Sequence, residues 1–577
     1  MHPSIPSSDQ NVPASASPAP QPTGEPAFPS RRDSLRLMGA GAALLGLTAF
    51  GNRAAAAGPA GGSLLEFAAT ALTMASMRAL SPTGWDDGAI VVLEGYFFRG
   101  DGGGGLFAWH ATDTTTDNSG TIIQLNGQST GRLWRIGPGT TYNEISTTLD
   151  VRWFGAIPDY ASNVTPYLAA AAAALPTNGF GTLYFPAGVY VFGSKLALAA
   201  NAPGNLTLKG DGPSSTIFYN VMSNSGMIEI AGNTGLHDIG FINGNGSPNA
   251  NDCVFLRDGN LRATNLHFSA FTNDACLHLR NGFAQISGVV TTNLDGCQLL
   301  VESCGGRVSN CFFSAGNGAG KTVRPCCIVQ ANPSGGAQTS LHIDSCSFKG
   351  QGPFPTYDGG GTASTIVLSS RYGPVHEGLI TNVFIDTTSS IGTQQDTIGL
   401  LAEGRSNGSS DVSGWTVSNF YVNGCQDAIR LHGRDLGSGK NVSSFTISNI
   451  YSVGGNVGTT TGVHANFIDC CAVTLTGLHC ADGSGLTDAV HIYCLENNYC
   501  DTFTISGVTS GAPAYPPNRT VVVCHGNVRN VFSIHHAANS GTPYGVQGGA
   551  SKGNGLLFLW PNGSGGLNCS GSLAQNV

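Results

Sequence analysis

A four-residue motif that returns along most of this chain is the feature that most constrains its fold. The motif has an apolar residue first, usually Ser, Thr or Asp second, Asn, Gly or Ser third, and an apolar residue last, as in V-S-N-F from Val417 and I-S-N-I from Ile447. Its third residue recurs every 22 to 37 residues, at Gly210, Asp238, Asn265, Gly288, Asn310, Ser345, Asn382, Asn419, Asn449, Gly477 and Gly507. Such a period indicates stacked units that cannot bury their apolar faces alone.

The residues between the motifs favour strands. Apolar positions alternate between Gly and Asn turns, and no amphipathic helical pattern of about 10–15 residues fills the gaps. With 82 glycines and only 11% charged residues, a long helical bundle is also disfavoured. Each period therefore predicts one coil of a parallel β-helix, an all-β solenoid of about ten to twelve coils over residues 146–545.

Stacking turns each motif position into a column of equivalent residues, about 4.8 Å apart from coil to coil. The first residue of the motif predicts a column inside the solenoid, made of Ala263, Ile286, Val308, Ile343, Ile380, Val417, Ile447, Leu475 and Ile505. The third residue predicts a column at a bend, because Asn and Gly tolerate left-handed backbone angles. We interpret these asparagines as structural.

The first 57 residues have the pattern of an export signal. Arg31-Arg32 is followed by an apolar stretch from Leu37 to Phe50 and an alanine run that ends at Ala57. This order predicts a twin-arginine signal peptide over residues 1–57 and a mature protein in the periplasm or outside the cell. Ser34 stands where this motif usually has Phe, and the alternative is an unstructured tail with chance arginines.

Composition limits the classes of molecule that this protein is expected to bind. The net charge of −9 and the absence of a Lys/Arg run argue against nucleic acid, and no apolar run is long enough for a membrane span once the signal is removed. The 16 cysteines include no C-x-x-C pair, which excludes the usual zinc spacing and leaves disulfides open. We expect no cofactor, with calcium as an open alternative that no acidic cluster demands.

Motifs at the start of the solenoid carry a resemblance to a known family. They are V-R-W-F-G-A-I-P-D from Val151, the alanine-rich segment after Pro166 and G-T-L-Y-F-P-A-G-V-Y from Gly181. Together they resemble the entrance of the pectate-lyase-like superfamily of right-handed parallel β-helix proteins, which includes rhamnogalacturonase-like and epimerase-like members. The segment from Gly95 to Trp109 is similar to the lead-in of polysaccharide depolymerases, including those of phages.

The resemblance implies a domain layout and a substrate class. We expect an N-terminal lead-in domain over residues 58–145, a capping helix, the right-handed β-helix over residues 146–545, and a C-terminal cap or tail over residues 546–577. The resemblance also implies a polysaccharide substrate. The usual paired-Asp and Gly-His-Gly set of polygalacturonases and the D-P-H-D signature of alginate epimerases are both absent, so neither specific activity is transferred.

A second repeated strand predicts the candidate site. It appears as D-T-I-G-L-L from Asp396, D-A-I-R-L-H from Asp427 and D-A-V-H-I-Y from Asp488. Aligning these motifs places the outward residues Gly399, Arg430, His464 and His491 in one column, Leu401, His432, Asn466 and Tyr493 in the next, and Glu403 and Arg434 in a third. The candidate catalytic residues are Glu403, Asp427, Arg430, His432 and His464, and the candidate substrate-binding residues are Arg434, Asn466, His491 and Tyr493.

These side chains suit two reactions on acidic sugars. Two carboxylates at a suitable distance would serve glycoside hydrolysis, whereas a His or Arg base beside a cation would serve β-elimination on a uronic acid. The hypothesis is an exported protein that cleaves a uronate-containing or other acidic glycan, as a lyase or a glycoside hydrolase. The alternatives are a non-catalytic carbohydrate-binding or envelope structural β-helix, a phage tail spike, which the export signal opposes, and a solvated face without a role.

Overall fold

The structure is a computed structural model of the whole chain, and it divides into two compact units at residues 64 and 65. The first unit, which contains the predicted signal peptide, lies outside the described residues. The structure describes residues 67–137, 147–176, 180–198, 205–223, 225–244, 252–269, 275–292, 296–314, 324–350, 352–355, 361–387, 397–404, 411–425, 427–433, 442–454, 462–481, 486–493 and 500–507, followed by the short segments 509–510, 522–525, 528–534, 545–547, 557–559 and 568–570.

A small β-sheet opens the second unit. Its strands are ordered β1-β2-β3-β5-β4, and the short helix α2 (Met74–Arg78) follows β1. The bounds are β1 (Phe67–Ala71), β2 (Ile90–Leu93), β3 (Gly105–His110), β4 (Ile122–Ile123) and β5 (Arg132–Ile136). Phe107, Trp109 and Leu133 lie in its core. This sheet lies within residues 58–145, where the sequence predicted a lead-in domain.

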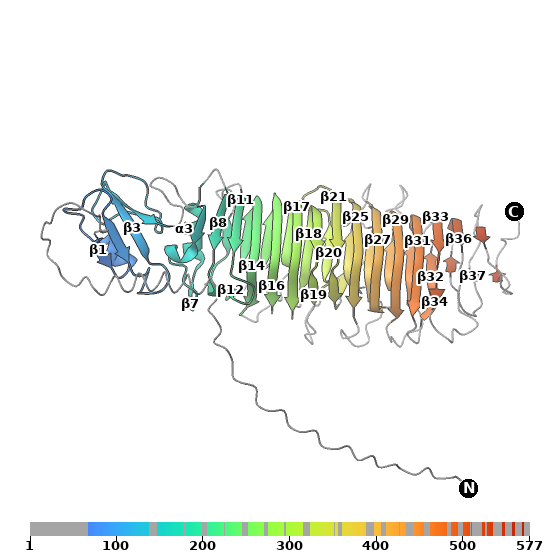
Figure 1. Cartoon of the computed structure of the whole chain (residues 1–577). Helices are drawn as coiled ribbons and strands as arrows, with labels where there is room; N and C mark the ends of the chain where they lie inside the picture. Colours follow the sequence, from blue (N-terminus) through green and yellow to red (C-terminus); the bar gives the residue numbers. More distant parts are fainter. Residues whose placement is uncertain are drawn as a thin grey trace, which may run out of the picture. The chain divides into compact units, whose positions relative to one another are not determined.

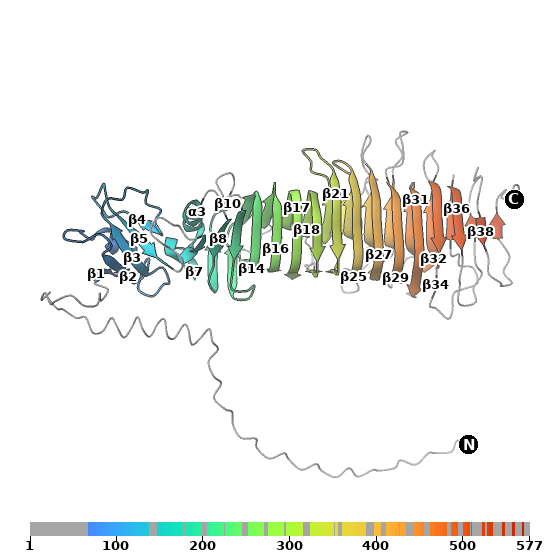
Figure 2. The ribbon, with the colours of Figure 1, turned by 45° about the horizontal axis from the view of Figure 1, so that its top comes forward.

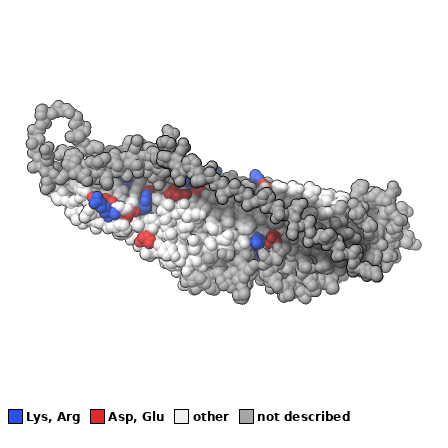
Figure 3. All heavy atoms as spheres, turned by 60° about the horizontal axis from the view of Figure 1, so that its bottom comes forward, with Lys and Arg blue, Asp and Glu red and all other residues white. Residues whose placement is uncertain are grey.

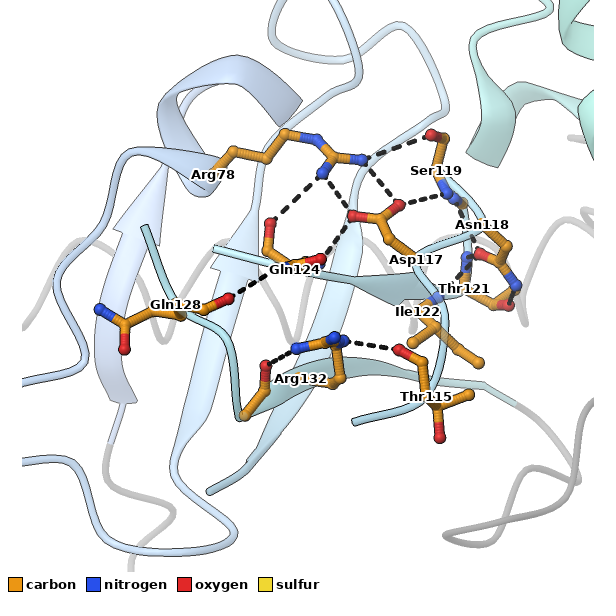
Figure 4. Close-up of polar contacts among 12 residues, drawn as sticks. Arg78, Thr115, Asp117, Asn118, Ser119, Thr121, Ile122, Gln124, Gln128 and Arg132 are labelled. Carbon is orange, nitrogen blue, oxygen red and sulfur yellow. Dashed lines mark hydrogen bonds and ion pairs between the residues drawn. The ribbon is translucent and has the colours of Figure 1, made fainter. Parts of the chain in front are cut away.

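An ion pair ties helix α2 to the segment before β4. Figure 4 shows the Arg78 guanidinium facing the Asp117 carboxylate, with Nη2 at 2.9 Å from Oδ1. The backbone N–H groups of Ser119 and Gln124 also donate to this carboxylate, each at 2.7 Å. Burial favours the neutral acid, but these bonds outweigh it and lower the pKa of Asp117. The D-N-S-G-T-I-I segment therefore holds the domain together.

The described strands from β6 onward form one long sheet wound into a solenoid (Figures 1 and 2), apart from β37 and β39, which pair with each other in a separate two-stranded sheet. Among the described strands of this sheet, the pairing of β23 with β24 is antiparallel and every other pairing is parallel. Its first elements are β6 (Thr148–Asp150), η1 (Val151–Phe154), β7 (Asp159–Asn163), α3 (Thr165–Ala173), β8 (Phe180–Tyr184), β9 (Gly188–Phe192), β10 (Leu196–Leu198), β11 (Asn205–Lys209), β12 (Thr216–Asn220), β13 (Ile228–Ala231) and β14 (Asn233–Asn243).

The strands stack side by side from β8 to β36 in both ribbon views (Figures 1 and 2). The middle strands are β15 (Val254–Arg257), β16 (Asn260–Ser269), β17 (Ala275–Thr292), β18 (Cys297–Ser309), β19 (Phe312–Ser314), β20 (Cys327–Gln330), β21 (Gln338–Asp344), β22 (Ser347–Lys349), β23 (Gly352–Pro355), β24 (Gly361–Ser369), β25 (Val375–Asp386), β26 (Thr397–Glu403), β27 (Val412–Cys425) and β28 (Asp427–His432). The last are β29 (Val442–Gly454), β30 (Gly462–Ile468), β31 (Cys471–Ala481), β32 (Leu486–Tyr493), β33 (Cys500–Ser506), β34 (Thr509–Ser510), β35 (Val522–His525), β36 (Val528–Ile534), β37 (Gly545–Gln547), β38 (Leu557–Leu559) and β39 (Asn568–Ser570). The predicted all-β right-handed parallel β-helix is confirmed.

Helix α3 covers the entrance of the solenoid, as expected for a capping helix. Its side chains Leu168 and Ala171 are fully buried in the same core as the first strands. Pro166 stands at the start of the helix, where the missing N–H costs nothing. In the part of the chain that the structure describes, no helix is long and apolar enough to cross a membrane.

Strand β17 shows how one coil is built. Left-handed residues at Asn281 and Gly288, with φ of 52° and 63°, divide it into three straight parts. The second of these bends is the predicted bend column, in which ten of the eleven anchors, from Asp238 to Gly507, have positive φ. The first bend has its own left-handed residues, among them the neighbours Asp258 and Asn281, which the sequence motif did not predict.

The predicted inner column is confirmed in every step. Strand pairing joins Ala263 to Ile286 and continues without a slip through Val417 and Ile447 to Ile505. All nine residues are buried in the main core. The apolar ladder is therefore the feature that sets the register of the coils.

Asn419 provides a test of the bend column. Its φ is 51°, its amide donates to Asn382 at 3.0 Å, and its own oxygen accepts from Asn449 at 3.2 Å. Asn419→Val should lower the free energy of unfolding by roughly 2–3 kcal/mol, because a β-branched residue is strained at positive φ and both hydrogen bonds are lost. Asn419→Gly should cost less. Denaturant unfolding measures both variants. Ser448 directly precedes Asn449, the residue that stacks on Asn419 in the next coil. A loss of stability from Ser448→Val as large as that from Asn419→Val would contradict the bend interpretation.

Candidate functional site

Charged groups are scarce on this protein, so a cluster of them stands out. Figure 3 shows one face of the molecule, on which the described surface is mostly white and several Lys or Arg residues lie beside Asp or Glu. Two clusters of charged residues lie on the outward side of the solenoid, each on the first strands of neighbouring coils. One lies on β26, β28 and β30, where the sequence predicted it. The other lies on β17 and β18 and just before β15.

Strand pairing fixes the outward columns of the predicted site. Leu401 pairs with Arg430, Arg430 with Asn466, and Asn466 with His491. The neighbouring column runs Glu403, His432, Ile468, Tyr493. These columns place Arg430 and His432 on one face of β28, about 7 Å apart.

The predicted columns are therefore out of register by two residues at each step from one coil to the next. The motif alignment placed Arg430 beside His464 and His432 beside Asn466, whereas the pairing places Arg430 beside Asn466. A slip of two residues keeps every side chain on its own face, because the period of a strand is two. The apolar pattern therefore could not detect the error.

Asp427, Arg430 and Asn466 form the first part of the site. Arg430 Nε donates to Asp427 Oδ2 at 2.6 Å, and Asn466 Nδ2 donates to the same oxygen at 3.2 Å. Asp427 is 1% exposed, and within the described residues neither its Oδ1 nor the Oδ1 of Asn466 has a hydrogen-bond donor. A buried carboxylate thus fixes the guanidinium of Arg430 on the outward face.

Glu403 and His432 form the second part. They are direct neighbours across β26 and β28. Glu403 is 1% exposed, whereas the His432 side chain is only half-buried. Asp427 pairs with Ile398, five residues before Glu403, so the Cα atoms of the two acidic residues lie roughly 16 Å apart along the strands. Of the two parts, only Arg430 and His432 present side chains that a ligand could reach.

His464 does not belong to the outward stripe. It is 1% exposed, and its Nδ1 lies 2.7 Å from Oγ of Ser452, a residue that pairs with the core residue Val422. Burial lowers the pKa of His464 to about 4, so the ring is neutral at pH 7. The predicted place of His464 on the stripe is wrong, because the slip of two residues moves it toward the start of β30.

The remaining predicted residues are only partly covered by the structure. Arg434 lies outside the described residues. His491 and Tyr493 belong to β32, in register with Asn466 and Ile468, but their side chains are outside the described part. Their proposed contact with a substrate stays a prediction.

The second cluster, here called the His278 cluster, was missed from the sequence. His278 Nδ1 lies 2.6 Å from Asp252 Oδ2, and its Nε2 lies 2.9 Å from Glu302 Oε2. Arg280 Nε donates to the same Glu302 oxygen at 2.6 Å, and Gln330 Nε2 donates to Glu302 Oε1 at 2.8 Å. The L-H-L-R pattern from Leu277, with polar residues alternating on one face, was a signal that could have found it.

The contacts of His278 require a charged ring. Ionised carboxylates only accept hydrogen bonds, so both ring nitrogens must carry protons to bond Asp252 and Glu302. Burial disfavours the imidazolium, but the hydrogen bonds and charges of the two carboxylates outweigh burial and raise the pKa of His278. Burial likewise favours neutral Glu302, yet the bond from His278 helps to lower the pKa of Glu302.

These opposite shifts predict how stability depends on pH. The raised pKa of His278 gives stability below the unfolded value of about 6.5, which is lost as the pH rises through the folded pKa. The lowered pKa of Glu302 gives stability above about pH 4.3, which is lost as the pH falls through its folded pKa. The excess stability of the native chain over His278→Gln should therefore be largest near pH 5–6 and shrink above about pH 7. Thermal melting across pH measures it, and a constant difference from pH 5 to 9 would contradict it.

His464 provides a control of opposite sign. Its pKa is lowered to about 4, so its contribution is present above the unfolded value of about 6.5 and is lost as the pH falls toward 4. Relative to the native chain, His464→Gln should therefore be least destabilised near pH 4. His278→Gln should instead be most destabilised near pH 5–6 and less destabilised above about pH 7, where His464→Gln loses most stability.

Within the described residues, no group of three or more His, Cys, Asp or Glu side chains is arranged to hold a metal ion. Of the cysteines from Cys253 to Cys480, whose side chains the structure describes, all but Cys471 are buried. They behave as small apolar core residues.

The N-terminal sheet is similar to a known domain. Residues 70–137 match the family described as the phage tail protein small four-stranded β-sheet domain. This match covers the lead-in sheet and leaves the solenoid unassigned. No curated protein matches the chain.

Solved structures resemble the chain at low sequence identity. The tailspike protein gp49 from Acinetobacter baumannii bacteriophage Fri1, a capsular polysaccharide depolymerase, is 12% identical, with a TM-score of 0.38 over 76% of this chain and 71% of that one. The A-module of the mannuronan C-5 epimerase AlgE4 from Azotobacter vinelandii is 14% identical, with a TM-score of 0.40 over 69% of this chain and 100% of that one. WceF from Pantoea stewartii, a glycan biofilm modifying enzyme, is 12% identical, with a TM-score of 0.31 over 77% of this chain and 48% of that one. At such values the substrate must be argued from the site.

Proposed function

We propose that this protein is an exported polysaccharide lyase that cleaves a uronate-containing glycan at the outward face of β26, β28 and β30. The observation that carries the proposal is the 2.6 Å contact of Arg430 with the buried carboxylate of Asp427. This contact orients a cation two residues from the half-buried ring of His432. A base beside a fixed cation is the arrangement that proton removal next to a carboxylate needs.

The geometry favours elimination over hydrolysis. Glycoside hydrolysis needs two carboxyl groups about 5–9.5 Å apart. The Cα atoms of Glu403 and Asp427 are roughly 16 Å apart along the strands. Both side chains are also only 1% exposed, so neither carboxylate is placed to act on a bound glycan as the acid or the nucleophile of a hydrolase.

In the proposed reaction, Arg430 binds the carboxylate of a uronate, and His432 removes the proton on the carbon next to it. The electron pair of that C–H bond forms the double bond as the bond from the ring to the glycosidic oxygen breaks. The leaving oxygen takes a proton from water or from protonated His432. Glu403 and Asp427 are positioning residues, for His432 and Arg430 respectively.

A product screen tests this proposal. Mature protein is incubated with polygalacturonate, alginate, bacterial capsular polysaccharides and neutral glucans. A lyase yields unsaturated ends in equal number to new reducing ends, whereas a hydrolase yields reducing ends alone. If a uronate glycan binds at this face and no bond breaks, the protein is a carbohydrate-binding β-helix.

We also propose export by the twin-arginine pathway. Replacing Arg31 and Arg32 with Lys should leave the precursor in the cytoplasm, because this pathway requires the arginine pair. Cell fractionation and the N-terminal sequence of the mature protein measure the result. Normal export of the variant, or a mature chain that still contains Pro29, would contradict this proposal.

A further inference from the structure

The His278 cluster lies on the same outward face as the proposed site, with Arg280 five coils from His432. Strand pairing joins Arg280 to Glu302, and the same column continues to Glu403 and His432. Five coils correspond to about 24 Å along the solenoid. In the column beside it, Ile328, Val367 and Leu401 pack together as an apolar cluster between the two polar ones.

The cluster has a buried part and an exposed part. The side chains of His278 and Glu302 are each 4% exposed, whereas those of Asp252 and Arg280 are 20% and 30% exposed. Every group bonds another across coils, so the buried part holds the exposed side chains in place. A mobile side chain loses conformational entropy when it binds a ligand. Asp252 and Arg280 are already held in place, so binding costs them less of this entropy.

Arg280 is fixed from two sides and still has donors left. Its Nε and Nη2 both lie 2.6 Å from Oε2 of Glu302, and its guanidinium lies 4.8 Å from the ring centroid of Phe255. Phe255 in turn stacks on His278, with centroids 4.5 Å apart. A guanidinium has five N–H groups, so Glu302 leaves three of them for another acceptor.

We propose that Arg280 and Asp252 form a second binding site, for a sugar that carries a carboxylate. Arg280 pairs with the sugar carboxylate, and Asp252 accepts hydrogen bonds from its hydroxyl groups. His278, Glu302 and Gln330 do not touch the sugar but hold these two side chains. The uronate class of ligand rests on the proposed function, whereas the site itself rests on the geometry of the cluster.

Calorimetric titration of the mature protein tests the second site. The probes are oligogalacturonate, oligomannuronate and oligoglucuronate of defined length, with a neutral glucan oligosaccharide of equal length as control. All titrations use the His432→Ala background, in which the proposed reaction should be slowed about a hundredfold or more. We expect two uronate sites and no binding of the neutral probe.

Variants separate the two sites. Arg280→Gln should weaken one of them about tenfold or more, because a hydrogen bond to a charged group is lost. Phe255→Leu should weaken the same site less, since the guanidinium keeps its charge and loses its support. Arg262→Gln is the matched control, because Arg262 is exposed on another face of the solenoid and should leave both sites intact. Should Arg280→Gln not fold, Arg280→Lys keeps the charge and should still weaken binding.

The outcomes distinguish this proposal from the proposed function. Uronate binding that responds to Arg280→Gln, in a protein that cleaves no glycan, supports the second site and overturns the lyase. Cleavage of a glycan with a single binding site that is indifferent to Arg280→Gln overturns the second site alone. Failure of all three uronate probes to bind also overturns it.

Discussion

Ile447→Asp is expected to destabilise the solenoid severely. Ile447 is fully buried between Val417 and Leu475 in the inner column, and the core around it is apolar. A carboxylate at this position either stays charged without a partner or is buried as a neutral acid without a donor, which costs roughly 3–5 kcal/mol or more. Circular dichroism during thermal or denaturant unfolding measures the loss.

The matched control is Thr446→Asp, one residue earlier in the same strand. Thr446 is exposed on the outer face, so a charge there remains hydrated and should change stability by only about 0.5 kcal/mol. Two variants with equal melting temperatures would mean that the inward assignment, and with it the register of the column, is wrong.

The second large effect is expected at the proposed site. His432→Ala should lower kcat by about a hundredfold or more, because the base that removes the proton is lost. Its stability should change little, since the ring is half-buried. Arg430 cannot be removed alone, because Asp427 would become a buried carboxylate without its guanidinium. The double variant Asp427→Asn with Arg430→Gln removes both charges at similar volume, and it should raise KM and lower kcat together.

Glu403 is tested separately, as Glu403→Gln, because an alanine would leave a cavity at a buried position. As a positioning residue, Glu403 should shift the pH dependence of kcat, in addition to lowering its value. Thr446→Ala should keep full activity. Full activity in the His432 variant and in the double variant would place the reaction elsewhere on the protein.

The inner column was predictable because burial selects one residue type at one motif position. All nine residues of the column, from Ala263 to Ile505, face the core, so the sequence pattern and the packing carry the same information. The bend column was predictable for a related reason, since Asn419 and Gly288 are residues that tolerate positive φ. These two columns were sufficient to predict the fold.

The outward columns were not predictable to the residue. Loops of unequal length separate the strands, and a slip of two residues leaves the inward and outward faces unchanged. His464 was therefore placed on the stripe although it is buried against Ser452. The burial of Glu403 and Asp427 was missed for a different reason, because alternation indicates a face and does not indicate what covers it.

Because strand pairing is unbroken between the two polar clusters, the number of coils between them sets the distance that separates them. Each coil advances the axis by about 4.8 Å, so the spacing between Arg280 and His432 is counted in whole coils. Gaining or losing one coil between them would move the clusters by one such step while each kept its own neighbours. Loops that change length within a coil would leave the spacing untouched. In a protein of this design, the distance between the two polar clusters can change only by whole coils, and the side chains of each cluster can change independently of that distance.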